Sequence, residues 1–227
     1  MYSFDTVIIS GGNIQDDFAL DFLGKARESA GSEGLRLIAA DHGLDFFASH
    51  GMQPDLAIGD FDSAGSQELL HKLPEECVIR LPREKDDSDT EAALMLAIRQ
   101  GAGRIAILGA TGTRVDHMLA NLGLLLRGRE NGVFVTLLDP WNCMRLVAPG
   151  EILLKKEQFG KYVSFCALGC EVEGLTLTGF QYPLSDYHLS FRDCGRTISN
   201  EFRDETAKVE YRSGDLLMIQ SRDEAMK

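Results

Sequence analysis

The stretch that decides the fold is Arg104-Ile105-Ala106-Ile107-Leu108-Gly109-Ala110-Thr111-Gly112-Thr113-Arg114-Val115-Asp116-His117. It passes from a short β-branched apolar run, residues 104–108, through a glycine-containing loop into an apolar helical pattern over residues 116–127. A buried strand that leads directly into a helix is the repeating unit of a parallel α/β sheet. We therefore expect this loop at the carboxyl edge of such a sheet, where open α/β folds bind ligands.

The loop itself suits a phosphate group. Gly109 and Gly112 allow the backbone to approach closely, the helix that starts near Asp116 offers unpaired N–H groups, and Arg114 supplies a charged fork. Neither Gly-x-x-x-x-Gly-Lys-Ser/Thr nor Gly-x-Gly-x-x-Gly is present, so the common P-loop NTPases and the dinucleotide dehydrogenases are not indicated. The structural alternative is a plain helix entry that is capped by Asp116 and leaves His117 partly buried.

Strand–helix alternation continues on both sides of this stretch and predicts parallel strands joined by crossover helices. Right-handed crossovers would place every strand-to-helix loop at the same sheet edge. The expected strands are 6–10, 35–40, 55–59, 78–81, 104–108 and 133–138. The expected helices are 16–26, a second one after Asp41-His42-Gly43, and then 66–72, 91–99 and 116–127.

The periodicity of apolar residues changes after Pro149-Gly150. Helical spacing ends there, and runs in which apolar and polar residues alternate follow, separated by turn residues. Examples are residues 162–168, 175–178 and 208–211. We therefore expect an α/β domain with a mostly parallel sheet flanked by helices, over residues 1–146. A small antiparallel, sandwich-like β domain should follow over residues 147–227.

An acidic cluster, Gly59-Asp60-Phe61-Asp62-Ser63, follows the predicted strand 55–59. A bend at Phe61 would aim both carboxylates at one cation, and hard oxygen ligands suit Mg²⁺. The alternative is a solvated turn in which Asp62 or Ser63 caps the next helix.

A second acidic cluster, Lys85-Asp86-Asp87-Ser88-Asp89-Thr90-Glu91, also stands at a helix start. Ser88-x-x-Glu91 is a capping box, and the neighbouring acids favour the positive end of the helix dipole. In the functional interpretation, Lys85 meets a phosphate and Asp89 meets a metal. A shift of one residue in the helix start exchanges Asp86, Asp87 and Asp89, so the pattern leaves the choice among them open.

Composition argues against several classes of protein, among them nucleic-acid-binding and membrane-spanning proteins. Lys and Arg number 23 against 35 Asp and Glu, and the resulting charge of −12 argues against a nucleic-acid partner. The N-terminal residues do not read as a signal peptide and no apolar run is long enough to cross a membrane, so a cytoplasmic protein is expected. Five cysteines without C-x-x-C spacing predict reduced, mostly buried thiols rather than disulfides or a zinc site.

The motifs together resemble those of thiamine pyrophosphokinases, in order from about residue 41 to the end. They are Asp41-x-Gly43, residues 59–63, Ser88-Asp89 in a Lys-Asp-x-Ser/Thr-Asp context, Gly109-Ala110-Thr111-Gly112-x-Arg114-x-Asp116-His117-x-x-Ala120-Asn121, and Ile198-Ser199-Asn200-Glu201. His42, Ser88 and Thr113 depart from the glycine, threonine and glycine that are common there. His42 in particular could change how the loop near Asp41 meets the nucleotide.

The resemblance implies an enzyme that transfers the pyrophosphoryl group of ATP to the hydroxyl of thiamine, giving AMP and thiamine diphosphate. It assigns Mg²⁺ to Asp60, Asp62 and Asp89, and charge compensation on the transferring group to Lys85 and Arg114. Asp116 would orient the thiamine hydroxyl or accept its proton. The implied nucleotide site comprises Asp41, Gly43, Gly109, Ala110, Thr111, Gly112, Thr113, Arg114 and Asn121.

The resemblance also implies a homodimer whose thiamine pocket forms where the β domain of one chain meets the α/β domain of the other. Ser199 and Asn200 would contact thiamine there, although such a pair at a strand end is more often a plain turn. Trp141 is a stacking partner for a ring or a packing residue beside the domain junction; the pattern does not decide between them.

Two other functions are compatible with the residues. The same nucleotide site could serve another alcohol, or transfer the γ-phosphate and release ADP. Outside enzymes, the chain could be a nucleotide sensor whose β domain reads the ligand for a partner. Metal-dependent turnover separates the two classes, because a sensor shows none.

Overall fold

The computed structural model describes residues 3–31, 34–61, 65–84, 87–112 and 114–224. The chain forms two compact units, Tyr2–Pro140 and Trp141–Met226. The sequence-based domain boundary between residues 146 and 147, with the functions assigned to each side, stays a prediction. In the described part of the chain, no helix has the length and apolar character needed to cross a membrane.

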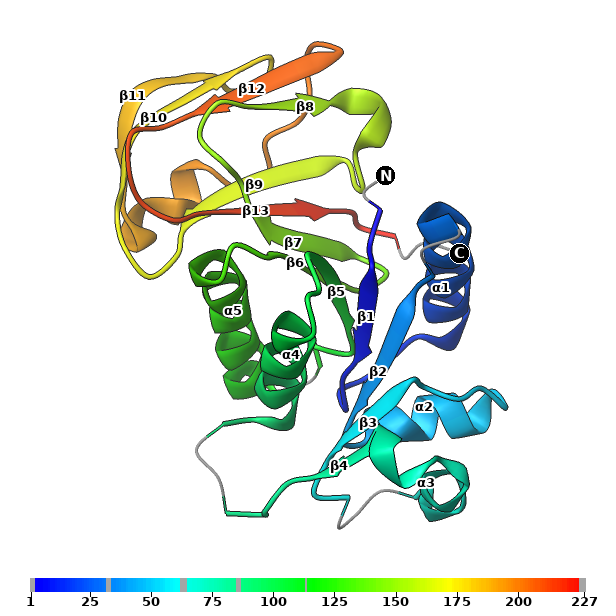
Figure 1. Ribbon diagram of the computed structural model, residues 1–227. Helices are drawn as coiled ribbons and strands as arrows, with labels where there is room; N and C mark the ends of the chain where they lie inside the picture. Colours follow the sequence, from blue (N-terminus) through cyan, green and yellow to red (C-terminus); the bar gives the residue numbers. More distant parts are fainter. Residues whose placement is uncertain (1–2, 32–33, 62–64, 85–86, 113, 225–227) are drawn as a thin grey trace. The chain divides into compact units, whose positions relative to one another are not determined.

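The first unit alternates strands and helices along the chain, as predicted (Figure 1). Its elements are β1 (Thr6–Ile9), α1 (Asp16–Ala30), β2 (Arg36–Ala40), α2 (Gly43–Ser49), β3 (Leu56–Gly59), α3 (Gln67–Lys72), η2 (Glu75–Cys77), β4 (Val78–Arg80), α4 (Asp89–Arg99), β5 (Arg104–Leu108), α5 (Val115–Glu130) and β6 (Phe134–Leu138). The strands pair in parallel in the order β4-β3-β2-β1-β5-β6. The expected parallel α/β sheet is confirmed.

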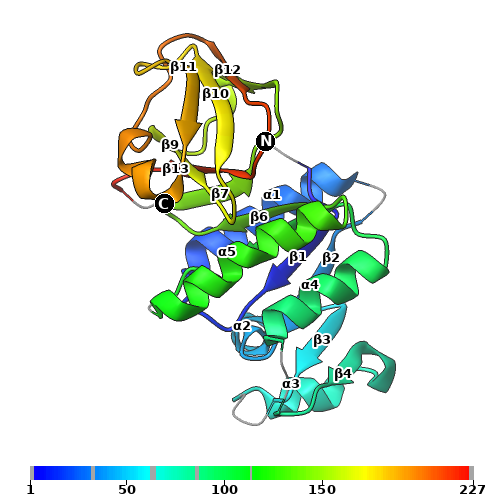
Figure 2. The same cartoon turned by 90° about the vertical axis from the view of Figure 1, so that its left-hand side faces the viewer.

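Helices cover both faces of this sheet. Helices α4 and α5 lie on one face, and α1, α2 and α3 lie on the other (Figures 1 and 2). The central strands are therefore buried on both sides, which explains why they are continuous apolar runs: Ile8, Ile9, Ile105 and Ile107 have no exposed surface.

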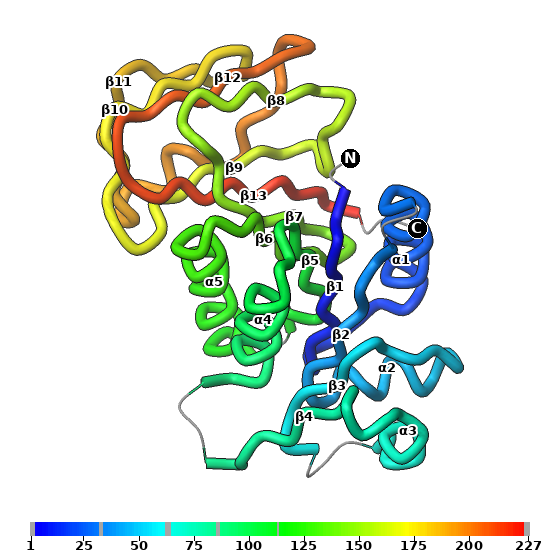
Figure 3. The backbone as a smooth tube through the Cα atoms, in the orientation of Figure 1, coloured from blue at the N-terminus to red at the C-terminus, as the bar shows by residue number. Residues whose placement is uncertain are grey.

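The strand order reverses beside β1. The chain leaves β1 for β2, β3 and β4 on one side, then returns to β5 and β6 on the other (Figure 3). The chain consequently continues from β1 and from β5 into helices on opposite faces of the sheet, α1 and α5. Open α/β folds bind ligands at this kind of switch point.

Two helix starts differ from the sequence-based expectation. Helix α4 begins at Asp89 rather than Glu91, with Ser88 as its N-cap and the Ser88 hydroxyl accepting a hydrogen bond from the Glu91 N–H. Helix α5 begins at Val115 rather than Asp116, with Arg114 in the N-cap position, so the structural alternative in which Asp116 caps the helix does not hold. The carboxylate of Asp116 is instead bound by Arg114, two residues earlier.

The second unit packs two antiparallel layers, as expected for a sandwich-like domain (Figure 1). Its elements are β7 (Asn142–Leu146), β8 (Glu151–Leu154), η3 (Lys155–Glu157), β9 (Tyr162–Ala167), β10 (Val172–Thr178), β11 (Leu184–Leu189), η4 (Phe191–Arg196), β12 (Thr206–Glu210) and β13 (Leu216–Ser221). The layers are β7-β13-β9 and β11-β10-β12-β8. Phe165 and Phe180 meet edge to face in its core, with ring centroids 5.5 Å apart.

The cysteines form no disulfide, but the prediction that most of them are buried is wrong. Cys170 is exposed, and Cys77, Cys143, Cys166 and Cys194 are partly buried. Cys166 contacts Cys194, and burial together with this neighbour raises the pKa of its thiol to about 12. It therefore stays a neutral thiol at physiological pH.

Candidate active site

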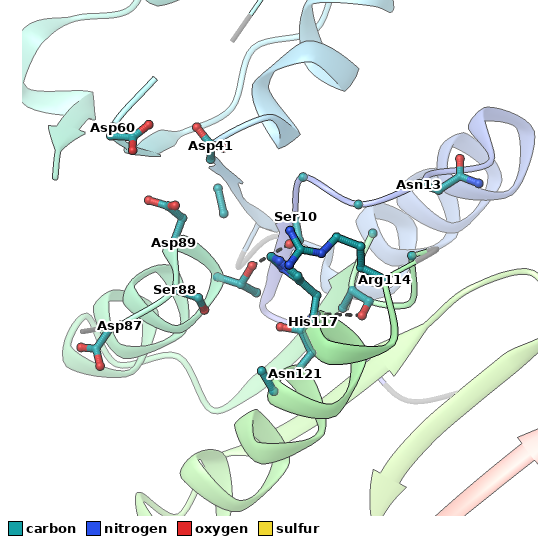
Figure 4. A pocket seen from close by; sticks show the side chains of 18 of the residues that line it. Ser10, Asn13, Asp41, Asp60, Asp87, Ser88, Asp89, Arg114, His117 and Asn121 are labelled. Atoms are coloured by element: carbon teal, nitrogen blue, oxygen red, sulfur yellow. Dashed lines mark hydrogen bonds between the residues drawn. The ribbon is translucent and has the colours of Figure 1, made fainter. Parts of the chain in front are cut away.

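A cavity of about 540 Å³ opens at the carboxyl edge of the parallel sheet. Loops after β1, β2, β3 and β5 line it, together with the first turns of α4 and α5 (Figure 4). Acidic side chains occupy one part of the cavity, and Arg114, His117 and Asn121 another. The three motif clusters that lie far apart in the sequence therefore meet at one place.

The acidic part contains Asp41, Asp60 and Asp89. Asp41 and Asp60 follow the neighbouring strands β2 and β3, and Asp89 opens helix α4. Burial raises the pKa of Asp41; the charges of Asp89 and Asp60 raise it further, and His42 partly opposes them. The repulsion that Asp89 and Asp60 exert on Asp41 would be relieved by a cation bound near this wall.

Asp41 carries a second sign of a ligand site. Its backbone is in the left-handed region, with φ of 47°, an uncommon conformation for a non-glycine residue. Within the described residues, its Oδ1 atom is buried and accepts no hydrogen bond. A buried carboxylate oxygen without a donor fits a hard divalent cation, so the residues present suit Mg²⁺.

The predicted metal set is only partly covered by the structure. Asp60 and Asp89 line the cavity, whereas Asp62 lies outside the described residues, as do Lys85 and Thr113. Among the residues that are described, no three His, Cys, Asp or Glu side chains stand close enough to hold an ion by themselves. Arg83, a basic residue that the sequence did not single out, lines the cavity and stands two positions before Lys85 in the sequence.

The loops after β1 and β5 pack backbone against backbone. The Gly12 N–H donates to the Gly109 carbonyl at 3.0 Å, and a Cβ on Gly12 would lie only 2.2 Å from that oxygen. Gly109 has φ of 72°, and a Cβ there would lie 2.5 Å from the Ser10 carbonyl oxygen. Residues 10–13 thus belong to the cavity wall; their signal in the sequence is the glycine pair that directly follows β1.

Helix α5 holds the β5 loop from the other side. The buried Asn121 donates from its amide to the Ala110 carbonyl at 2.8 Å. Gly109, Ala110, Gly112 and Asn121 line the cavity, as the predicted nucleotide site requires; Thr111 and Gly43 are not part of its lining. Gly43 packs against the backbone of β1 instead, where a Cβ would lie 1.9 Å from the Ile9 carbonyl oxygen.

Arg114, which lines the cavity, forms a two-pronged ion pair with Asp116, which is not part of the lining. The guanidinium donates to both carboxylate oxygens, at 3.1 and 2.5 Å, and both side chains are exposed. The hydrogen bonds from Arg114 lower the pKa of Asp116 to about 2. His117 also lines the cavity and is exposed, so the structural alternative with a partly buried His117 does not hold.

Ser199 and Asn200 lie in the second unit, where the chain runs beside β9. Ser199 is exposed and has φ of 55°, and its N–H donates to the Ser164 hydroxyl. Asn200 is buried, and its amide bonds both the N–H and the carbonyl of Tyr182. Asn200 thereby presents Tyr182, whose side chain is 64% exposed, next to Ser199. Trp141 is half-exposed, with 39% of its surface accessible to solvent.

These contacts predict different effects for the two neighbours. Asn200→Ala should lower the free energy of unfolding by about 1–3 kcal/mol, because it removes a buried amide and both of its hydrogen bonds to the part-buried backbone of Tyr182. Ser199→Ala keeps its backbone bond and should change stability by less than about 0.5 kcal/mol. Urea unfolding of both variants tests this, and equal effects would contradict the structural role of Asn200.

Comparisons with known proteins agree with this geometry. Residues 32–137 match the family described as thiamin pyrophosphokinase, catalytic domain, and residues 151–216 match thiamin pyrophosphokinase, vitamin B1 binding domain. The thiamine pyrophosphokinase of Bacillus subtilis is 35% identical over 189 residues, which are 82% of this chain and 87% of that protein.

Solved structures give the same result. The crystal structure of thiamine pyrophosphokinase from Bacillus subtilis superimposes with a TM-score of 0.80 at 30% identity, covering 96% of this chain and 99% of that one. That of Geobacillus thermodenitrificans has a TM-score of 0.77 at 30% identity, covering 96% and 97%. The family expected from the motifs and the expected fold class are both confirmed. The chain belongs to the thiamine pyrophosphokinase family.

Proposed function

We propose that this protein uses Mg²⁺ and ATP to convert thiamine to thiamine diphosphate. The thiamine hydroxyl oxygen bonds to the β-phosphorus of ATP, the bond from that phosphorus to the α-β bridging oxygen breaks, AMP leaves, and the hydroxyl proton is lost. The observation that carries this proposal is the convergence of Asp41, Asp60 and Asp89 with the β1 and β5 glycine loops on one cavity. Phosphoryl-transfer sites are built from such metal-binding acids and phosphate-binding backbone.

Asp60 and Asp89, with the predicted Asp62, would hold the Mg²⁺, and Asp41 adds a carboxylate beside them. Bound there, the ion would neutralise charge on the phosphate oxygens and align the attacking and leaving oxygens. The nucleotide would lie against residues 109–112 and 10–13, where glycines allow close approach to the backbone. Arg114 supplies positive charge at the opposite part of the cavity, with Lys85 as the second predicted cation.

The experiment that tests the proposal incubates the purified protein with ATP, Mg²⁺ and thiamine and resolves the products by chromatography. Equal amounts of AMP and thiamine diphosphate are expected. ADP with thiamine monophosphate would keep the site but refute attack at the β-phosphorus. Turnover with another alcohol alone would refute thiamine as the acceptor, and the absence of any turnover would favour the sensor function.

Asp116 should orient the thiamine hydroxyl rather than remove its proton. A carboxylate whose pKa is about 2 is ionised near neutral pH, but it is a weak base. Asp116→Asn is expected to lower kcat/KM for thiamine on the order of a hundredfold through lost positioning. Because Asp116 does not titrate between pH 5 and 9, the shape of the pH–rate profile should not change; an acidic limb lost in the variant would show that Asp116 is the base.

The second unit is proposed to bind thiamine through the exposed segment around Ser199 and Asn200. The Tyr182 ring, which Asn200 presents there, offers an aromatic face to a planar cation. We also propose a homodimer in which this segment completes the site of the partner chain. Light scattering should then give twice the 25.0 kDa chain mass, and a monomer that remains fully active would refute the shared site.

A further inference from the structure

Two buried hydroxyl groups join the end of β1 to the first turn of α4. Ser10 Oγ and Thr90 Oγ1 share a hydrogen bond of 2.6 Å, and the two residues are only 5% and 8% exposed. Both line the cavity, and Thr90 directly follows Asp89. The bond therefore connects the residue beside a proposed metal ligand to the sheet edge.

This bond differs from the other contacts of the α4 start. The hydrogen bond of Ser88 with the Glu91 N–H is internal to the helix, and Arg127 ties Glu91 to α5 on the same side of the sheet. Ser10, in contrast, directly follows β1, which pairs with β2, and Asp41 is the residue that directly follows β2. The Ser10–Thr90 bond thus links the start of α4, which carries Asp89, to the sheet edge that carries Asp41 and Asp60.

Repulsion between carboxylates opposes the position that Asp89 has in the structure. The carboxylates of Asp60 and Asp89 both act on Asp41, and like charges repel. Without a cation, this repulsion pushes the first turn of α4 away from the ends of β2 and β3. A short buried hydrogen bond at the adjacent residue opposes such a movement, because its geometry tolerates little displacement.

We propose that Ser10 and Thr90 are positioning residues that hold the Asp89 carboxylate at the acidic part of the cavity, where it can serve as one ligand of a divalent cation. The inference rests on the proposed function, since it takes the acidic part of the cavity as the metal site. Groups that orient metal ligands typically change metal affinity or activity 10- to 100-fold when they are removed.

The test measures Mn²⁺ binding to the full-length protein by electron paramagnetic resonance, with and without a non-hydrolysable ATP analogue. Thr90→Val and Ser10→Ala should each weaken Mn²⁺ binding by about tenfold. Thr90→Ser keeps the hydroxyl and should restore the affinity of the original protein. The double variant should be no weaker than either single variant, because both remove one shared bond. In steady-state assays of Thr90→Val and Ser10→Ala, the Mg²⁺ concentration that gives half-maximal activity should rise, whereas KM for thiamine should stay unchanged.

The outcomes separate this inference from the function on which it rests. If the unmodified protein binds Mn²⁺ and all variants bind it equally well, Ser10 and Thr90 have no positioning role. If the variants have a lower melting temperature but bind Mn²⁺ as tightly as the unmodified protein, the Ser10–Thr90 bond contributes only to stability, and the inference is overturned. If the unmodified protein binds no Mn²⁺ even with the ATP analogue, the metal assignment falls together with the inference.

Discussion

Asp89→Asn is expected to lower kcat/KM for thiamine on the order of 100- to 1000-fold. A metal ion supplies several kcal/mol of charge stabilisation in phosphoryl transfer, and about 1.4 kcal/mol corresponds to a factor of ten in rate. An amide keeps the shape of Asp89 but removes the charge that balances the cation. Initial rates measured over a range of Mg²⁺ concentrations check this, and excess Mg²⁺ should recover part of the lost activity.

Asp87→Asn is the matched control for this variant. Asp87 lines the same cavity two residues earlier but is exposed, whereas Asp89 is partly buried at the first position of α4. Its replacement should change kcat/KM by less than about threefold, as is usual for an exposed charge. A large loss in Asp87→Asn with normal activity in Asp89→Asn would exchange the two assignments.

Asp89→Asn should also make the metal-free protein more stable. The pKa of Asp41 is raised by its burial and by Asp89 and Asp60, so above that pKa the folded protein carries a charge that it disfavours. Removing the Asp89 charge relieves part of this penalty at pH 7 in the presence of a chelator. As the pH falls through the raised pKa of Asp41, protonation relieves the same penalty and the difference should shrink. Thermal unfolding at pH 7 and pH 4 tests the sign.

The second large effect concerns stability. Gly43→Ala should destabilise the protein by about 3 kcal/mol, at the upper end of the cost of overpacking, and lower the melting temperature by roughly 6–12 °C. The new Cβ would lie 1.9 Å from the Ile9 carbonyl oxygen, which is main chain and cannot rotate away. The start of α2 would have to move from β1, and Asp41 lies just before that helix.

Gly24→Ala is the control for Gly43→Ala. Gly24 lies inside α1, is exposed, and has no atom within 4 Å of an added Cβ. Alanine is the better helix former, so this variant should gain about 0.5–1 kcal/mol. If thermal melts show Gly43→Ala to be as stable as the unmodified protein, the close packing of α2 on β1 is not a constraint.

Much of the site could be predicted because its signals are local. Apolar runs that end in glycine or acid identify strands and their carboxyl edge, and Ser88 marks the α4 start through a bond to a residue three positions away. The ordered motifs identified the family, since each lies within a short segment. At α5, local patterns left an Asp116 cap open as an alternative; in the structure Arg114 holds the N-cap position without a side-chain capping bond, and its guanidinium binds Asp116.

What the sequence by itself determined is the alternation of strands and helices, the edge where ligands bind, and the family. Tertiary structure alone decided that β5 returns to lie beside β1, and the contacts that follow from this. Those contacts are the backbone packing of Gly12 on Gly109, the Ser10–Thr90 bond, and the meeting of Asp89 with Asp41. Asn200 is a similar case, because its bonds to Tyr182 span 18 positions. Propensity and periodicity act between near neighbours, whereas these partners are selected by strand order and sheet register, which depend on the whole packed chain.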